Sequence, residues 1–189
     1  IPDRIEAGTF MIAAAITNGD LELHGAKMEH MRALVDRLRR VGVVIERGEK
    51  GIAVSSSRRL EPVVITTQPF PGFPTDLQAQ AMALLCLADG NSVITEKIYP
   101  DRFLHVGELN RMGAQLRKEG PTVIIEGVKR LVGAPVMASD LRASAALILA
   151  GLVAKGTTRV HRAYHIDRGY ESIETKLAAV GANIRRMNE

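Results

Sequence analysis

The chain has 189 residues, of which 46% are hydrophobic and 24% charged, an ordinary balance for a soluble globular protein. Its single cysteine excludes a disulfide within the chain and indicates a reducing compartment, and its longest apolar run, 143–154, is shorter than the roughly 20 residues of a membrane helix. The net charge of +4 is compatible with anionic partners, but no aromatic residues interleave with the lysines and arginines, so nucleic acid is not expected as a partner. Because the apolar run is short, a membrane is not expected either.

The first predicted unit opens at Asp3 and contains two different helices. Residues 5–17 are apolar nearly all round, which predicts a helix buried on every side. A strand is expected at 21–25. The second helix, 31–42, carries apolar residues at i, i+3, i+4 and i+7 and charges on the other side, so it is amphipathic. A hairpin, VVIERGEKGIAV, follows it.

The same order recurs twice along the chain. The second unit is expected to comprise a leading strand at 63–67, a buried helix at 76–88, a strand at 92–96, a second helix at 105–113 and a hairpin from residue 114. The third is expected to comprise a strand at 135–137, a buried helix at 141–154, a strand at 158–162, a second helix at 170–181 and a strand at 182–185 whose closing partner is missing.

The spacing of these units indicates an internal repeat. From the opening Asp to the first Gly is 16, 14 and 16 residues, and from that Gly to the second is 23, 23 and 25 residues. We therefore predict an α/β fold of the α+β type. It would be an inverse α/β barrel of three β-α-β-α-β-β repeats, pseudo-threefold, with buried helices inside small sheets. The repeats would span about 1–60, 61–132 and 133–189 of one domain.

Two of the repeated helix starts carry residues suited to chemistry. In FPTDLQAQ, Asp76 is either an N-cap, satisfying free backbone N–H groups, or a carboxylate base that faces a cleft. In SDLRAS, Asp140 has the same two interpretations. Arg142 lies in the first turn, where the helix dipole disfavours a cation, so its presence there favours an anionic partner.

Two turns that precede second helices carry arginines. Arg102 lies in YPDRF and Arg168 in HIDRGY. Such an arginine, close to backbone N–H groups, suits phosphate or carboxylate binding, and the competing interpretation is a solvated loop paired with the adjacent Asp. His165 is a candidate acid or base, and Cys86, within an apolar helix, is expected to be a buried hydrophobe. No metal-ligand cluster, P-loop or dinucleotide fingerprint is present, so neither a metal nor a cofactor is expected.

Five stretches resemble the enolpyruvyl transferase family, in the branch that acts on UDP-N-acetylglucosamine. They are IPDRIEAGTF, FPTDLQAQ, ITEKIYPDRFLHVGELNRMGA, DLRASAALILAGL and YHIDRGYESIETKLAAVGANI. The resemblance implies transfer of the enolpyruvyl group of phosphoenolpyruvate to the 3-hydroxyl of UDP-N-acetylglucosamine, an early committed step of peptidoglycan synthesis in the bacterial cytoplasm. It implies a fold of two domains, each of three such repeats.

The resemblance also assigns roles to residues. It implies that Asp76 is the base, that Ile98 contacts the nucleotide sugar through its backbone, and that Arg102 and Arg168 contact phosphoenolpyruvate. Asp140 and Arg142 would line the same cleft.

Part of the family's active site is expected to lie outside these residues. The mobile loop with the cysteine usually assigned as proton donor, and a Lys-Asn pair, belong to the family's other part, and Cys86 does not match that loop. The chain starts at Ile1, not Met, so we expect that an N-terminal part is missing. The resemblance implies that the chain is a carboxyl-terminal domain whose partner is the N-terminal domain of the same protein. The alternatives are a shikimate 3-phosphate enolpyruvyl transferase and a non-catalytic binding domain of the same fold.

Overall fold

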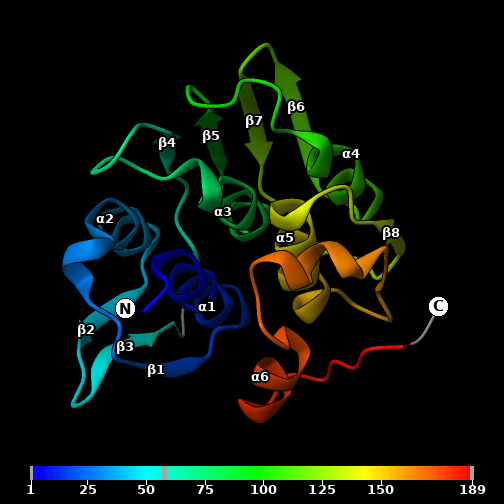
Figure 1. The fold of residues 1–189 in the computed structure, drawn as a ribbon. Coiled ribbons are helices and arrows are strands. Elements are labelled where there is room, and N and C mark those ends of the chain that lie inside the picture. Colours follow the sequence, from blue (N-terminus) through cyan, green and yellow to red (C-terminus); the bar gives the residue numbers. More distant parts are fainter. Residues whose placement is uncertain (1, 57–58, 188–189) are drawn as a thin grey trace.

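The computed structural model describes residues 2–56 and 59–187. Three helices lie at the centre, with three small sheets and three further helices around them (Figure 1). The central helices are α1 (Arg4–Thr17), α3 (Gln78–Leu85) and α5 (Leu141–Val153), and the outer ones are α2 (Arg32–Val41), α4 (Leu104–Arg111) and α6 (Ile173–Ala179). Short 3-10 turns are η1 (Met28–His30), η2 (Thr75–Leu77) and η3 (Ala163–Arg168).

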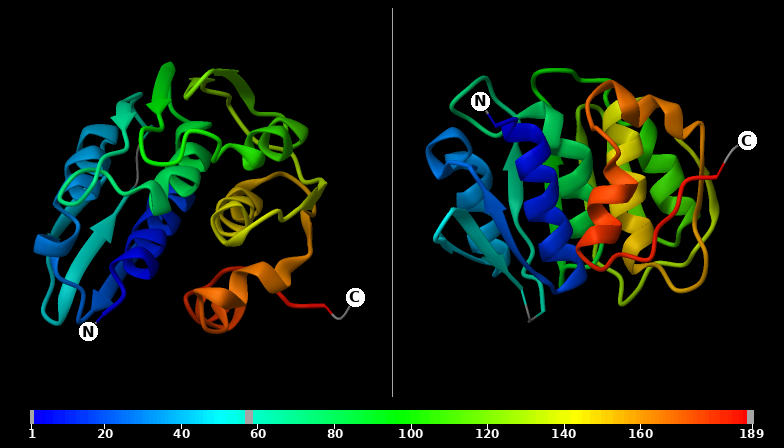
Figure 2. Two further views of the ribbon diagram at one scale, coloured as in Figure 1. Left: turned by 45° about the horizontal axis from the view of Figure 1, so that its top comes forward. Right: turned by 60° about the horizontal axis from the view of Figure 1, so that its bottom comes forward.

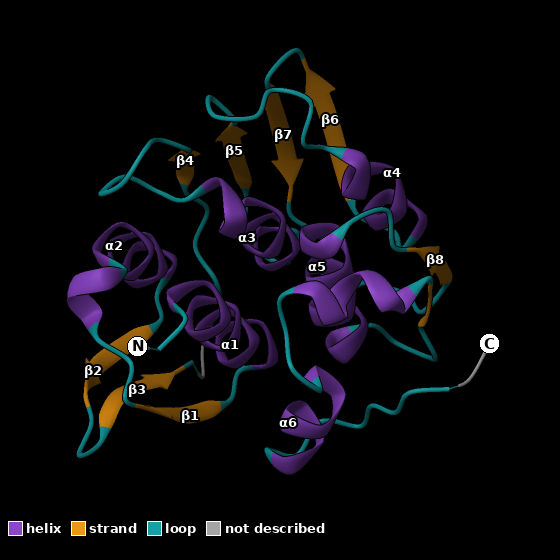
Figure 3. Cartoon of the chain, viewed as in Figure 1, coloured by secondary structure: helices purple, strands orange, loops and turns teal. Residues whose placement is uncertain are grey.

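The strands form three separate sheets, one for each unit. The first contains β1 (Asp20–His24), β3 (Gly51–Ser55) and β2 (Val44–Arg47) in that order. The second contains β4 (Val64–Thr66), β5 (Asn91–Thr95), β7 (Thr122–Glu126) and β6 (Gln115–Glu119), and the third β8 (Pro135–Met137) and β9 (Arg159–His161). Figure 3 shows the strands around the helical interior, so the predicted α/β fold with buried helices and small outer sheets is confirmed, without a closed barrel among the described residues.

The pairing pattern repeats between the sheets. β4 pairs parallel with β5, and β8 pairs parallel with β9. The hairpins β2–β3 and β6–β7 are both antiparallel, and each places its second strand next to β1 or β5. The division of the chain into one domain with boundaries near residues 60 and 132 stays a prediction.

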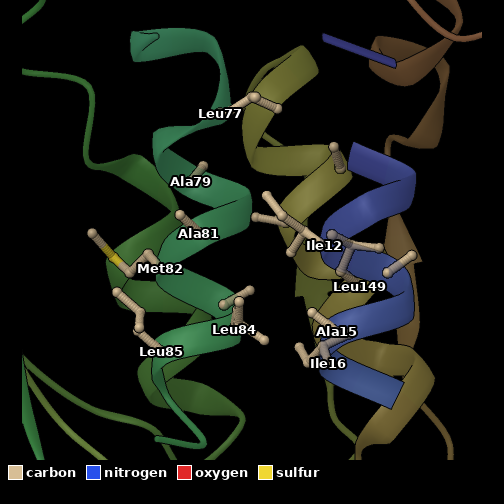
Figure 4. Packing of buried hydrophobic residues seen from close by; sticks show 14 of the residues in the cluster. Ile12, Ala15, Ile16, Leu77, Ala79, Ala81, Met82, Leu84, Leu85 and Leu149 are labelled. Atoms are coloured by element: carbon tan, nitrogen blue, oxygen red, sulfur yellow. The ribbon is translucent and has the colours of Figure 1, made fainter. Parts of the chain in front are cut away.

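The three central helices pack directly against one another, and Figure 2 shows them running side by side. Their buried faces are rich in alanine, which lets helix backbones approach closely, with larger aliphatic side chains between them. Figure 4 shows this packing, with Ile12 and Ile16 of α1, Met82 and Leu84 of α3 and Leu149 of α5 all buried. The expectation that these helices are buried on every side is confirmed for α3 and for the middle of the other two, residues 8–16 of α1 and 143–150 of α5, whereas the end turns of α1 and α5 are half-buried and Thr17 is exposed.

The expected strand at 182–185 is wrong. Residues 182–187 form neither helix nor strand. In the first two sheets the corresponding segment is held by a hairpin partner, β3 or β7. No strand of the described residues lies beside 182–187 to accept its ladder hydrogen bonds, and a strand conformation without such a partner gains little.

A close backbone approach gives a testable stability prediction. Gly127 follows β7, and its N–H donates to the carbonyl of Gly90 at 3.0 Å. A Cβ at this position would collide with the carbonyl oxygen of Ala88, a backbone atom that cannot swing away. Gly127→Ala is therefore expected to lower the free energy of unfolding by about 2 kcal/mol, measured by denaturant titration. Gly107→Ala is the control: its Cβ meets nothing within 4 Å in α4, so a gain of about 0.5–1 kcal/mol is expected. Equal effects of the two changes would contradict this account.

Candidate functional site

The carboxylate of Asp76 lies between two arginines from different units. Arg102 Nη1 donates to its Oδ1 at 2.8 Å, and Arg142 Nη2 lies 3.2 Å from its Oδ2. The side chains are 37%, 27% and 15% exposed for Asp76, Arg102 and Arg142, so the cluster is open to solvent chiefly at the carboxylate. Such an arrangement can bind an anion through the arginines and accept a proton at the carboxylate.

Local structure explains why Asp76 faces the arginines instead of capping a helix. Residues Thr75–Leu77 form the 3-10 turn η2, and the residue that precedes α3 is Leu77, so Asp76 lies one position too early to cap that helix. No side-chain cap bond is made at either η2 or α3. The carboxylate oxygens are therefore free for the arginines, and the competing N-cap interpretation of Asp76 is wrong.

Asp140, in contrast, is an N-cap. Its Oδ1 accepts from the backbone N–H of Arg142 at 2.8 Å and of Ala143 at 2.9 Å. The cap fixes the first turn of α5, and Arg142 projects from that turn onto Asp76. The cation that the helix dipole disfavours is thus compensated by a carboxylate from another unit.

The charges around Asp76 set its protonation state. Partial burial alone would raise the pKa of this carboxyl, but the positive charge of Arg142 and the hydrogen bond from Arg102 outweigh burial, and the pKa is lowered from its ordinary value. Asp76 is consequently a carboxylate at neutral pH, the form that a general base requires.

Arg102 is held in place by contacts from both sides. Its Nη1 also donates to Thr75 Oγ1 at 3.1 Å, and its own carbonyl accepts from Gln78 Nε2 at 3.1 Å. The Tyr99 ring lies beside the guanidinium, 5.9 Å from Cζ to the ring centroid. The structure therefore brings together Asp76, Arg102 and Arg142 in direct contact, as the sequence led us to expect.

Arg168 and Ile98 are exposed and do not touch the Asp76 carboxylate. Arg168 ends η3, next to Gly169, which packs against Leu141 at the start of α5. Tyr170 follows, and its hydroxyl accepts from Gln80 Nε2 at 3.2 Å. These contacts place Arg168 near the same end of α5 as Asp140 and Arg142. A role for Arg168 and Ile98 in binding stays a prediction.

The remaining candidates do not join the cluster. Cys86 is fully buried, and burial raises the pKa of its thiol to about 12, so the expectation of an inert hydrophobe is confirmed. The His165 ring contacts the Tyr164 ring in a tilted arrangement, with 4.4 Å between the ring centroids. No group of acidic, His and Cys side chains suited to a metal occurs within residues 2–56 and 59–187. None of the helices in this part of the chain is long and apolar enough to cross a membrane.

Sequence reasoning missed several polar residues of the site's surroundings. Gln80, Thr9 and Tyr170 form a buried network that links α1, α3 and the segment after η3, and Gln80 Nε2 also donates to the carbonyl of Asp76 at 3.0 Å. Glu96 is fully buried at the end of β5. The sequence signal that could have revealed them is a polar residue within an otherwise apolar segment. Burial of such a side chain costs free energy unless it is hydrogen-bonded.

A buried histidine beside the site gives a prediction of pH-dependent stability. Burial lowers the pKa of His105 to about 4, Asp140 acts in the opposite sense, and Arg102 reinforces the lowering. The folded protein therefore binds this proton less readily than the unfolded chain. The free energy of unfolding is therefore highest above pH 6.5, and it decreases by about 3 kcal/mol as the pH falls toward 4. Denaturant unfolding at pH 4 to 7 should show a shallower pH dependence for His105→Gln than for wild type. Parallel curves would show that His105 protonates as easily folded as unfolded.

Comparison with known proteins shows consistent similarity to one family. The family model described as EPSP synthase (3-phosphoshikimate 1-carboxyvinyltransferase) matches residues 1–177. The chain is 58% identical over 189 residues to a UDP-N-acetylglucosamine 1-carboxyvinyltransferase of Geobacter metallireducens and 57% identical to one of Lawsonia intracellularis, covering all of this chain and 45% of each relative. The chain thus spans about half the length of these curated relatives.

Solved structures share the fold. The enolpyruvyl transferase NikO from Streptomyces tendae matches with a TM-score of 0.88 and 28% identity, covering 98% of this chain and 44% of that one. An EPSP synthase from Acinetobacter baumannii matches with a TM-score of 0.70 and 20% identity, covering 98% of this chain and 43% of that one, a likeness of fold alone.

Proposed function

The chain belongs to the EPSP synthase family of carboxyvinyltransferases, and from this premise we propose its reaction in the intact protein. The enolpyruvyl group of phosphoenolpyruvate is transferred to the 3-hydroxyl of UDP-N-acetylglucosamine, and phosphate is released. The observation that carries the proposal is the Asp76 carboxylate between Arg102 and Arg142, on a chain 58% identical to a UDP-N-acetylglucosamine 1-carboxyvinyltransferase.

The arrangement fits the chemistry of that transfer. The acceptor oxygen forms a bond to C2 of phosphoenolpyruvate and loses its proton to a base. C3 takes up a proton as that bond forms. When the bond between C2 and the phosphate oxygen then breaks, phosphate leaves and C3 gives up a proton, which restores the double bond between C2 and C3. In the proposal, Asp76 accepts the hydroxyl proton, because it is ionised at neutral pH and partly exposed. Arg102 and Arg142 stabilise the anionic groups of the donor, since guanidinium binds phosphate and carboxylate with paired hydrogen bonds.

The same proposal assigns the surrounding residues. Arg168 would contact phosphoenolpyruvate from the end of η3, and Asp140 would line the cleft while capping α5. Ile98 would contact the nucleotide sugar through its backbone carbonyl, because its N–H is already donated to Glu96 Oε1 at 2.8 Å.

The rest of the active site is proposed to come from the remainder of the protein. A proton donor for C3 of phosphoenolpyruvate is still needed, and the buried, protonated Cys86 thiol cannot serve. We therefore propose a second domain of the same protein as the partner that closes over Asp76. The enzyme would act in the bacterial cytoplasm, at an early step of peptidoglycan synthesis.

A phosphate-release assay on the intact protein tests the proposed reaction. With phosphoenolpyruvate present, phosphate should appear only after UDP-N-acetylglucosamine is added, and not after shikimate 3-phosphate. Turnover with shikimate 3-phosphate would assign the other branch of the family. If neither acceptor gives phosphate release but the protein still binds the nucleotide sugar, it is a non-catalytic binding protein of the same fold.

A further inference from the structure

Glu96, which the proposed mechanism does not use, is a buried carboxylate with four hydrogen-bond donors. Its Oε1 accepts from Thr67 Oγ1 at 2.6 Å and from the backbone N–H groups of Ile98 and Tyr99 at 2.8 and 3.0 Å. Its Oε2 accepts from Thr75 Oγ1 at 2.9 Å. The side chain is 0% exposed. Burial of a carboxylate is costly, and this complete set of donors is what makes it tolerable here.

Through these donors, Glu96 connects the ends of two strands and a loop to the site formed by Asp76, Arg102 and Arg142. Thr67 follows β4, Ile98 and Tyr99 begin the loop that leads from β5 to Arg102, and Thr75 opens η2. Lys97 N donates in turn to Thr67 Oγ1 at 2.9 Å. A single carboxylate therefore fixes the start of the loop that carries Arg102 and the residue next to Asp76.

Glu96 determines the direction in which the Thr75 hydroxyl donates its hydrogen. Thr75 Oγ1 is the donor in its bond to Glu96 Oε2, so the Thr75 hydrogen points toward Oε2. The lone pairs of Thr75 Oγ1 are then available to Arg102 Nη1, which donates to it at 3.1 Å and to Asp76 Oδ1 at 2.8 Å. The chain of bonds runs from Glu96 through Thr75 to Arg102 and Asp76, each donor meeting an acceptor.

We propose that Glu96 is a positioning residue for the proposed transfer reaction: through Thr75 it holds the Arg102 guanidinium against Asp76, in place for the anionic donor substrate. This inference rests on the proposed function. Glu96 itself is too deeply buried to touch substrate, so its effect must pass through Thr75 and Arg102.

Two variants of the intact protein interrupt the chain at different bonds. Thr75→Val keeps the shape of the side chain and removes the hydroxyl. Glu96→Gln can keep an oxygen on the Ile98 and Tyr99 N–H groups but places an amide donor against Thr75, which forces its hydroxyl to turn. Each is expected to lower kcat/KM for phosphoenolpyruvate by about 10-fold, the usual scale for a hydrogen bond to a charged group. The KM for UDP-N-acetylglucosamine should stay within about twofold.

The double variant separates positioning from general loss of structure. If Glu96 acts through Thr75, Glu96→Gln combined with Thr75→Val should be no worse than the poorer single variant, because one bond cannot be broken twice. Thr75→Ser should restore near-normal kcat/KM. Thr95→Val is the matched control: Thr95 is the last residue of β5 and directly precedes Glu96, but its hydroxyl is bonded to the hydroxyl of Thr122 at 3.1 Å, so activity should be unchanged. The inference would be overturned if the loss of kcat/KM in the double variant were the product of the two single losses. It would also be overturned if Thr95→Val lost as much kcat/KM as the other single variants.

A readout without turnover keeps this test apart from the proposed function. In the ligand-free protein, Thr75→Val and Glu96→Gln should increase the mobility of the Arg102 guanidinium, seen as a fall in the 15N–1H heteronuclear NOE of its Nε–H, while Thr95→Val should not. An inactive wild type would refute the proposed reaction and leave this comparison intact. Unchanged Arg102 signals in both variants would refute the positioning role.

Discussion

Asp76→Ala in the intact protein is expected to lower kcat by about 10²–10⁴-fold, the contribution of a positioned general base. The carboxylate is the partly exposed group between Arg102 and Arg142, and it makes no cap bond whose loss would complicate the result. Steady-state phosphate release, with both substrates saturating, measures the effect. The affinity for the nucleotide sugar should fall much less than kcat.

Two further variants define what the loss means. Asp76→Asn keeps the size of the side chain and one oxygen for an arginine but cannot take up a proton, so it should be nearly as slow as Asp76→Ala. Asp36→Ala removes an exposed carboxylate that pairs with Arg40 on α2, and it should leave kcat unchanged. Near-normal turnover by Asp76→Asn would show that Asp76 only orients the arginines.

A polypeptide limited to these 189 residues is expected to show no detectable phosphate release from phosphoenolpyruvate and UDP-N-acetylglucosamine. It supplies the proposed base and the proposed anion-binding arginines but covers only 45% of its relatives' length. Loss of a positioned acid alone costs roughly 10²–10⁴-fold in rate, and loss of half the substrate contacts removes orientation worth several kcal/mol more.

Complementation gives this prediction a positive outcome. Addition of the remaining part of the protein in trans should restore measurable turnover, and the same addition to the Asp76→Ala chain should not. Phosphate release by the 189 residues alone, with full-length enzyme excluded, would refute the proposal that the active site is shared between two parts of the protein.

The central helices and the repeat could be predicted from the sequence because their signals are local. An apolar run over 5–17 or 141–154 favours a buried helix, and the middle turns of α1 and α5 are in the interior. The strand expected at 182–185 failed because a strand requires a neighbour, and the local pattern of ANIR contains no information about one.

The site was only partly predictable, for the same reason. FPTDLQAQ and SDLRAS look alike, yet Asp140 caps α5 and Asp76 does not, because the 3-10 turn starting at Thr75 shifts the first turn of α3 away from it. Glu96 attracted no attention because its side-chain donors, Thr67 and Thr75, lie 29 and 21 residues away and meet it only in the folded chain.

A crystal structure of the intact protein with UDP-N-acetylglucosamine bound tests directly whether Asp76 is the base. We expect an oxygen of the Asp76 carboxylate to lie about 2.6–3.2 Å from the sugar's 3-hydroxyl, within reach of its proton, with Arg102 and Arg142 lining the adjacent donor site. A nucleotide sugar whose 3-hydroxyl faces another residue, with Asp76 out of its reach, would contradict it.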